Sequence, residues 1–167
     1  RAMKRLLLTG LALVLMAGGA LAASVEAAFD YALKPQRLAD GVYAFIGHTE
    51  DFDTVNGGNI ANAAFIVAPE GVIVVDSGSS LRYGRQMRAA IAAVTDKPVA
   101  LVINTHHHPD HTGGNFELKA GTGCQIIGPR ADNARIPGID VVVGDGDIVA
   151  IGRHRARVLD TPGHTRG

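Results

Sequence analysis

The most constraining feature of this 167-residue sequence is a cluster of metal-binding side chains in the middle of the chain. Four such residues fall within six positions of one another: His106, His108, Asp110 and His111. They directly follow the apolar run 99–105, which is typical of a buried β-strand. Imidazole and carboxylate groups are the ligands that zinc and similar divalent metals accept. The sequence therefore predicts a fold in which a buried strand delivers a metal-binding loop.

The spacing within the cluster assigns different directions to its side chains. His106 and His108 are two residues apart, so on an extended segment they point the same way and can hold one metal ion. His107 then points the opposite way and is not expected to bind that ion. A proline ends the extended segment. Asp110 and His111 follow where the chain changes direction, so we expect them to reach a second metal ion.

A surface tract or a purification tag is the alternative explanation of a histidine cluster. A tag would consist of histidine alone and would lie at a terminus. This cluster lies mid-chain, contains aspartate and follows a predicted strand. These features favour metal binding.

A further candidate ligand lies far downstream. His164 follows a Pro-Gly pair, which favours a turn, after another strand-like run at 154–160. As a third ligand beside His106 and His108, it would leave a fourth tetrahedral position open for water, as in catalytic zinc sites. Taken alone, a histidine after Pro-Gly is equally consistent with an ordinary turn residue.

Together these motifs resemble those of the metallo-β-lactamase fold superfamily of metallohydrolases. The resemblance rests on the run at 106–111, on Thr-Pro-Gly-His at 161–164, and on the strand-like run 72–78 that contains Asp76. It implies that Asp76 orients the metal-site loop. A helix N-cap or a turn carboxylate is the alternative role for this residue, and the two roles are compatible. The resemblance extends from about Gly41 to the end of the chain.

The resemblance implies an α/β (α+β) fold, a metallo-β-lactamase-type αββα sandwich of which this chain supplies the N-terminal portion. Members of the superfamily continue past the third histidine and supply further ligands of the second metal there. We therefore expect a lead-in at 23–40 and a domain at 41–167 that is truncated at its C-terminus. The lone cysteine, Cys124, precedes His164 and does not match the family's late cysteine, so we predict a small buried thiol.

Pattern alone predicts one layered domain of mixed α and β structure. Short apolar or alternating runs predict strands at 42–46, 59–68, 71–75, 99–103, 125–127, 140–143 and 148–151. Apolar residues at helical spacing predict a helix over 81–94. The polar, glycine-rich stretch 48–58 is expected to be a loop, either a flap over the metal site or a solvated connector. His48 and His154 are expected to be surface histidines.

The first residues have the pattern of an export signal. Positive charges at Lys4 and Arg5, an apolar stretch to about Met16 and small residues ending at Ala22 are typical of a secretory signal peptide. A membrane helix is the alternative, but the apolar run is short for a span. We therefore expect residues 1–22 to be cleaved, no stable membrane anchor to remain, and the protein to be periplasmic or secreted.

Composition limits the partners. Lys and Arg number 16, as do Asp and Glu, and the chain has no Trp. Balanced charge gives no basic surface for phosphate backbones, and few aromatic residues leave little for base stacking. A small-molecule substrate is expected, and no nucleic acid. The sequence does not determine the oligomeric state.

The function expected from these motifs is metal-dependent hydrolysis. A divalent metal lowers the pKa of bound water to near neutrality, and the resulting hydroxide attacks an ester, thioester, lactone or β-lactam carbonyl. We expect Zn²⁺, two ions in a full-length protein, with iron as the alternative metal. Asp110 is the expected catalytic residue, which orients the nucleophile or accepts its proton.

Within the superfamily, the resemblance is loosely to the zinc metallohydrolases associated with quinoprotein systems. Glutathione-thioester hydrolases share the His-His-His-x-Asp-His run, although export argues against a cytosolic thiol substrate. An iron-dependent sulfur dioxygenase, which uses the same ligand set, is the alternative enzyme. An inactive fragment of a metallohydrolase is the other alternative.

Overall fold

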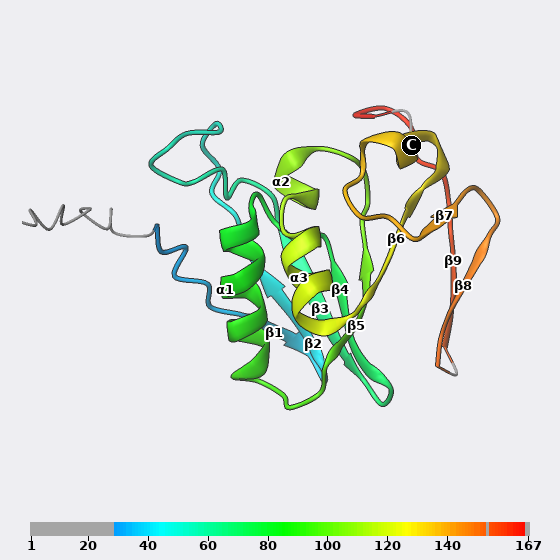
Figure 1. Ribbon diagram of the computed structural model, residues 1–167, viewed down its shortest axis with the longest axis horizontal. Helices are drawn as coiled ribbons and strands as arrows, with labels where there is room; N and C mark the ends of the chain where they lie inside the picture. The colour runs from blue at the N-terminus through cyan, green and yellow to red at the C-terminus, as the bar shows by residue number, and fades with distance from the viewer. Residues whose placement is uncertain (1–28, 153, 166–167) are drawn as a thin grey trace, which may run out of the picture.

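The computed structural model of the protein describes residues 29–152 and 154–165 (Figure 1). A seven-stranded sheet has the order β1-β2-β3-β4-β5-β6-β7. Its strands are β1 (Gln36–Ala39), β2 (Val42–Phe45), β3 (Ala63–Ala68), β4 (Gly71–Val75), β5 (Val99–Ile103), β6 (Gln125–Pro129) and β7 (Val141–Val143). The strands from β1 to β4 pair antiparallel, and those from β4 to β7 pair parallel. The carboxyl ends of β4, β5 and β6 therefore meet at one edge of the sheet.

Helices cover one face of this sheet. α1 (Leu81–Ala92) and α3 (Asn115–Thr122) lie side by side there, and the single turn α2 (Pro109–Thr112) precedes α3 (Figure 1). A 3₁₀ helix, η1 (Arg130–Arg135), follows β6. Ser80 begins α1 by accepting a hydrogen bond from the Tyr83 amide.

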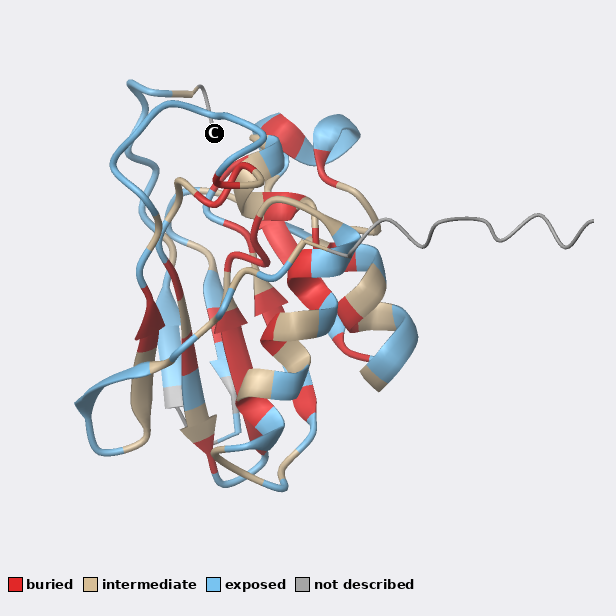
Figure 2. Cartoon of the chain, turned by 90° about the vertical axis from the view of Figure 1, so that its left-hand side faces the viewer, coloured by how far each residue is buried: buried red, intermediate tan, exposed pale blue. Residues whose placement is uncertain are grey.

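The main core lies between these helices and the sheet, where Figure 2 shows the buried residues to be concentrated. Its largest buried apolar side chains are Phe45, Phe65, Val72, Val74, Tyr83, Met87, Ile91, Val102, Leu118 and Ile126. Removal of such apolar surface from water is the main driving force for folding. The site at the strand ends therefore rests on a rigid, well-packed support.

A smaller apolar cluster occupies the opposite face of the sheet. Its buried members are Ala68, Ile73, Leu101, Ile127 and Val149. Val149 belongs to β8 (Ile148–Ile151), which pairs with β9 (His154–Arg157) as a separate two-stranded sheet. The layers are thus helices, a sheet and the start of a second sheet, so the predicted α/β class is confirmed, with part of the expected sandwich.

Most predicted elements are present with small changes in their bounds. The predicted helix at 81–94 ends at Ala92, and the predicted hairpin pairs Ala68 with Gly71. β1 falls within the expected lead-in 23–40 and pairs with β2, so the sheet begins before residue 41. The pattern did not predict α2, α3 or η1.

Two further predictions concern the first residues of the chain and its single cysteine. The expected signal peptide at 1–22 lies outside the described residues. None of the helices in the described ranges is both long and apolar enough to cross a membrane. Cys124 is 2% exposed, so the prediction of a buried thiol is confirmed, and burial raises its pKa.

Candidate metal centre

The candidate site lies at the edge of the sheet where the parallel strands β4 and β5 end. Asp76 directly follows β4, and its carboxylate accepts hydrogen bonds of 2.8 Å from both the amide and the hydroxyl of Thr105. Its φ of 59° lies in the left-handed region, which aspartate adopts more readily than most residues. The carboxylate thereby fixes the start of the loop at residues 104–111, which carries four histidines and is called the histidine loop below. Ser80, not Asp76, is the N-cap of α1.

His106 has one ring nitrogen in this network and one outside it. The Thr105 hydroxyl has a single hydrogen, which it donates to Asp76. It therefore accepts from Nδ1–H of His106 at 3.0 Å. Nε2 of His106 is then unprotonated, and it is buried with no hydrogen-bond partner among the described residues. Burial, followed by the charges of His111 and His108, lowers the pKa of His106 to about 4.

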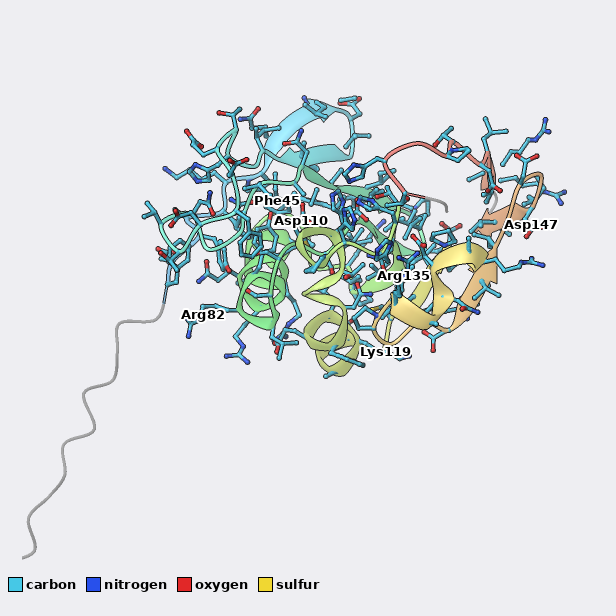
Figure 3. All side chains as sticks on the ribbon, turned by 90° about the horizontal axis from the view of Figure 1, so that it is seen from above. Phe45, Arg82, Asp110, Lys119, Arg135 and Asp147 are labelled. Atoms are coloured by element: carbon cyan, nitrogen blue, oxygen red, sulfur yellow. The ribbon has the colours of Figure 1, made fainter. Side chains whose placement is uncertain are left out.

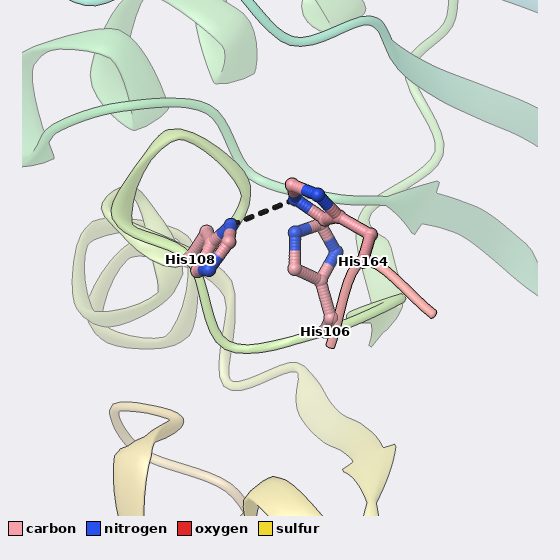
Figure 4. Close-up of side chains that lie close together, drawn as sticks. All are labelled: His106, His108 and His164. Carbon is pink, nitrogen blue, oxygen red and sulfur yellow. Dashed lines mark hydrogen bonds between the residues drawn. The ribbon is translucent and has the colours of Figure 1, made fainter. Parts of the chain in front are cut away.

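Three histidine rings converge beside this nitrogen (Figure 4). The ligand atoms of His106, His108 and His164 all lie within 4.8 Å of one another. Nε2 of His164 lies 3.0 Å from Nδ1 of His108, the contact dashed in Figure 4. Metal–nitrogen bonds of about 2.0–2.1 Å around a tetrahedral ion place such nitrogens about 3.4 Å apart. This spacing fits a bound divalent ion, as does the His106 nitrogen that has no partner within residues 29–152 and 154–165.

Asp110 and His111 form a second pair of candidate metal ligands next to these rings. His111 donates from Nδ1 to Asp76 Oδ2 at 2.7 Å, and its Nε2 lies 3.5 Å from Asp110 Oδ2. The rings of His106 and His111 are 4.0 Å apart between centroids. Burial disfavours the charged form of His111, but the hydrogen bond to Asp76 and the charges of both carboxylates outweigh it and raise its pKa. Asp110 Oδ2 and His111 Nε2 are thus placed to share an ion.

His107 points away from the three converging rings, towards η1. Its Nδ1 lies 2.8 Å from Oδ2 of Asp132, which also accepts the His107 amide at 3.2 Å. Arg135 donates to Nε2 of His107 at 2.9 Å and forms an ion pair with Asp132. Burial raises the pKa of Asp132, but His107 and Arg135 outweigh it, and that pKa is lowered overall.

A buried polar chain holds the end of the histidine loop. The Ser77 hydroxyl donates to Asn115 at 2.8 Å, and the Asn115 amide donates to Asn104 at 2.7 Å. Ser77 and Asn104 both donate to the carbonyl of His111, at 2.7 Å from the amide and 3.1 Å from the side chain respectively. A Cβ at Gly114 would lie 2.2 Å from the Ser77 carbonyl, so only glycine fits there.

An open pocket of about 630 Å³ lies beside the converging rings. Its lining residues are His107, His108, Ala131, Arg135, His164 and Thr165. In the view onto this end of the molecule, the labelled Asp110 lies over the helices and the labelled Arg135 lies on the η1 side (Figure 3). The pocket thus joins two of the converging histidines to a cationic side chain.

The structure separates the sequence-predicted site residues into distinct groups. His106, His108 and His164 converge, Asp110 and His111 pair beside them, and Asp76 contacts the loop. His48 is exposed and lies 3.6 Å from Glu50, apart from the three-histidine group. The side chain of His154 lies outside what the structure describes. The loop at 48–58 does not contribute to the lining of the pocket.

Sequence reasoning missed several polar residues of the site: Ser77, Asn104, Thr105, Asn115, Asp132 and Arg135. Two of them, Asn104 and Thr105, stand directly before the histidines, and this position is the one signal that marks them. Asp132 and Arg135 belong to a charged stretch that is typical of an exposed surface.

A known family matches the part of the chain that carries this site. The model of the metallo-beta-lactamase superfamily matches residues 56–167. That range holds the histidine loop, Asp76 and His164, and it amounts to more than half of the chain.

Curated relatives match shorter stretches more closely. A hydroxyacylglutathione hydrolase of Rhodospirillum rubrum is 64% identical over 66 residues, which cover 40% of this chain and 26% of that protein. A second one, of Brucella anthropi, is 43% identical over 102 residues, covering 58% of this chain and 39% of that protein. The chain thus spans about a quarter to two-fifths of the length of these relatives.

Solved structures share the fold over a longer range. A subclass B3 metallo-β-lactamase of Bradyrhizobium japonicum superposes with a TM-score of 0.64 at 25% sequence identity. The superposition covers 80% of this chain and 54% of that chain. The shared architecture agrees with the partial αββα sandwich described above.

Proposed function

Because this chain belongs to the metallo-β-lactamase superfamily, we propose that it is part of a metal-dependent hydrolase that cleaves a thioester. The observation that carries the proposal is the convergence of three imidazoles within 4.8 Å, one of which presents a buried Nε2 that has no hydrogen-bond partner in the described part of the chain. Buried polar atoms of this kind are rare unless a ligand satisfies them. Three protein nitrogens also leave a tetrahedral metal position open, as catalysis needs.

The residues of the site divide the chemical tasks between them. His106, His108 and His164 hold one ion, and Asp110 and His111 contribute to a second. A divalent ion at such a site makes hydroxide available at neutral pH and polarises a carbonyl. Asp110 orients that nucleophile or accepts its proton. Thr105 accepts from Nδ1 of His106, and Asp76 accepts from Nδ1 of His111, so the Nε2 atom of each ring is the one that would bind metal.

The thioester assignment draws on the curated relatives. The proteins named hydroxyacylglutathione hydrolase match locally at 64% and 43% identity. We propose zinc as the metal, two ions in the complete enzyme, and export of the protein through residues 1–22. Because an exported enzyme does not meet a cytosolic thiol, the proposal specifies the thioester bond and leaves the thiol half of the substrate open.

Metal content and substrate turnover test this proposal. The protein is purified in the longest form that its gene encodes, its metals are measured by mass spectrometry, and hydrolysis of S-lactoylglutathione and a chromogenic cephalosporin is followed. We expect zinc and thioester cleavage that a chelator abolishes and added zinc restores. His106→Ala should lose bound zinc and thioester cleavage. His48→Ala, at an exposed histidine outside the site, should keep the zinc and the cleavage activity of the wild type.

Other outcomes would decide against the proposal. Turnover that survives chelation, or that His106→Ala leaves unchanged, would remove the metal from the mechanism. Cephalosporin cleavage without thioester cleavage would reassign the substrate to β-lactams. Bound iron with oxygen consumption would identify a sulfur dioxygenase.

A further inference from the structure

We propose that Arg135 recognises an anionic group of the substrate, a carboxylate, next to the candidate metal ligands. This inference rests on the proposed function, because it assigns a substrate feature to the same pocket. It makes Arg135 a specificity-determining residue that acts on binding and not on the chemical step.

The pocket is built to receive such a group. Its volume of about 630 Å³ lies in the range of small-molecule sites. Two candidate metal ligands, His108 and His164, line one part of it, and Arg135 lines another. None of the described lining residues carries a carboxylate. The carboxylate that pairs with Arg135, that of Asp132, is wholly buried and does not line the pocket.

The guanidinium of Arg135 is fixed at two points. Nη1 donates to Nε2 of His107 at 2.9 Å, and Nη2 donates to Oδ1 of Asp132. Asp132 is 0% exposed, so this ion pair has a rigid, desolvated anchor. Because arginine only donates, His107 accepts at Nε2 and gives its Nδ1 hydrogen to Asp132 at 2.8 Å.

The anchored guanidinium keeps donors available. Arginine has five N–H groups, and the contacts with His107 and Asp132 use two of them. The side chain of Arg135 is 51% exposed, although its ion-pair partner is wholly buried. A planar guanidinium pairs well with a carboxylate. Because its plane is already held, a substrate loses less entropy on binding to it.

A second arginine of η1 supplies the comparison. Arg130 pairs with Asp147 at 3.2 Å, and it is not among the residues that line the pocket. Both arginines belong to the same short helix and carry the same charge. They differ in whether they face the pocket, and substitution at Arg130 therefore controls for the loss of one positive charge from this region.

Two matched thioesters test the inference. They are identical except that one has a carboxylate where the other has a primary amide, and kcat and KM are measured for the zinc-loaded, longest form of the protein. For Arg135→Gln we expect KM for the carboxylate substrate to rise about tenfold or more, from loss of hydrogen bonds to a charged group. KM for the amide and both kcat values should stay within about twofold, as should all constants of Arg130→Gln.

Separate controls distinguish a failure of folding, or of the proposed function, from a failure of the inference about Arg135. Arg135→Lys keeps a charge beside Asp132 but loses the planar fork, so it should fold and still show a raised KM for the carboxylate substrate alone. Equal changes in KM for the two substrates, or no change, would overturn the inference. If the wild-type protein cleaves neither thioester, the proposed function fails. In that case, calorimetry measures the affinity for non-hydrolysable thioether analogues with and without the carboxylate. If Arg135→Gln leaves the affinity for the carboxylate analogue unchanged, the proposed role of Arg135 is overturned.

Discussion

Asp76 holds Thr105 through two hydrogen bonds of 2.8 Å, one from the backbone amide and one from the side-chain hydroxyl. The two residues follow neighbouring parallel strands, so the contact ties the end of β4 to the start of the histidine loop. The same carboxylate also accepts from His111 at 2.7 Å. The buried side chain of Asp76 therefore orients His111 directly and His106 through Thr105, and these are candidate ligands of the two different ions.

Substitution of Asp76 should weaken metal binding more than it alters the fold. Asp76→Asn keeps the shape and tolerates the left-handed backbone, but one amide oxygen cannot accept from all three donors. We expect metal affinity to fall about 10- to 100-fold, as for other residues that orient metal-binding histidines. Competition with a chromophoric chelator measures this. Asp53→Asn, in an exposed loop, is the control, and equal affinity in the Asp76 variant would refute the role.

Asp132 should contribute strongly to stability. It is wholly buried and binds both His107 and Arg135, so Asp132→Asn leaves Arg135 facing an amide group. Loss of hydrogen bonds between a buried carboxylate and charged or polar partners costs about 1.5–3 kcal/mol, and Arg135, which is half-exposed, stays in contact with water. Urea denaturation measures the loss. Asp40→Asn breaks an exposed pair with Arg37 and should change nothing measurable; a similar null effect at Asp132 would contradict the prediction.

Asp140 should make stability depend on acid pH. The hydrogen bond from Lys119, then the Ile126 amide, lowers its pKa. A carboxyl group whose pKa is lower in the folded state stabilises the protein above its ordinary value of 3.8, and this stabilisation is lost as the pH falls through the folded pKa. The difference in unfolding free energy between wild type and Asp140→Asn should therefore be present at pH 7 and shrink below pH 3.8. A Lys119→Met background should reduce it, and a difference that does not vary with pH would count against the ion pair.

Elements with a strong apolar signal were predictable from the sequence, and those without one were not. Strand β5 is a continuous apolar run, and α1 buries residues at helical spacing, such as Met87 and Ile91. Helix α3 has one large buried apolar residue, Leu118, and its Phe116 is exposed, so no stripe marks it. All four residues of β1 are exposed, which leaves an edge strand without alternation.

The same reasoning explains which parts of the candidate site were predictable. The histidine loop is local in sequence, so its spacing alone assigned opposite directions to His106 and His107. The partner of His107 is Asp132, 25 residues away in a charged stretch, and it is buried only because the fold brings η1 against the loop. Burial of a charged residue by tertiary packing leaves no periodic trace in the sequence.

Asp110 should affect turnover far more than metal content at the three-histidine group. Its side chain lies 3.5 Å from Nε2 of His111 and outside the group formed by His106, His108 and His164. Asp110→Asn should therefore leave the fold and that first ion nearly intact, because none of the three ligands loses a partner. Thioester hydrolysis by the longest form of the protein should fall about 100-fold or more, the usual effect of a lost acid–base group. Steady-state kinetics, metal analysis and a thermal melt on the same sample separate these effects. Unchanged turnover would exclude Asp110 from the mechanism, whereas loss of the first ion together with activity would make it a structural member of that group.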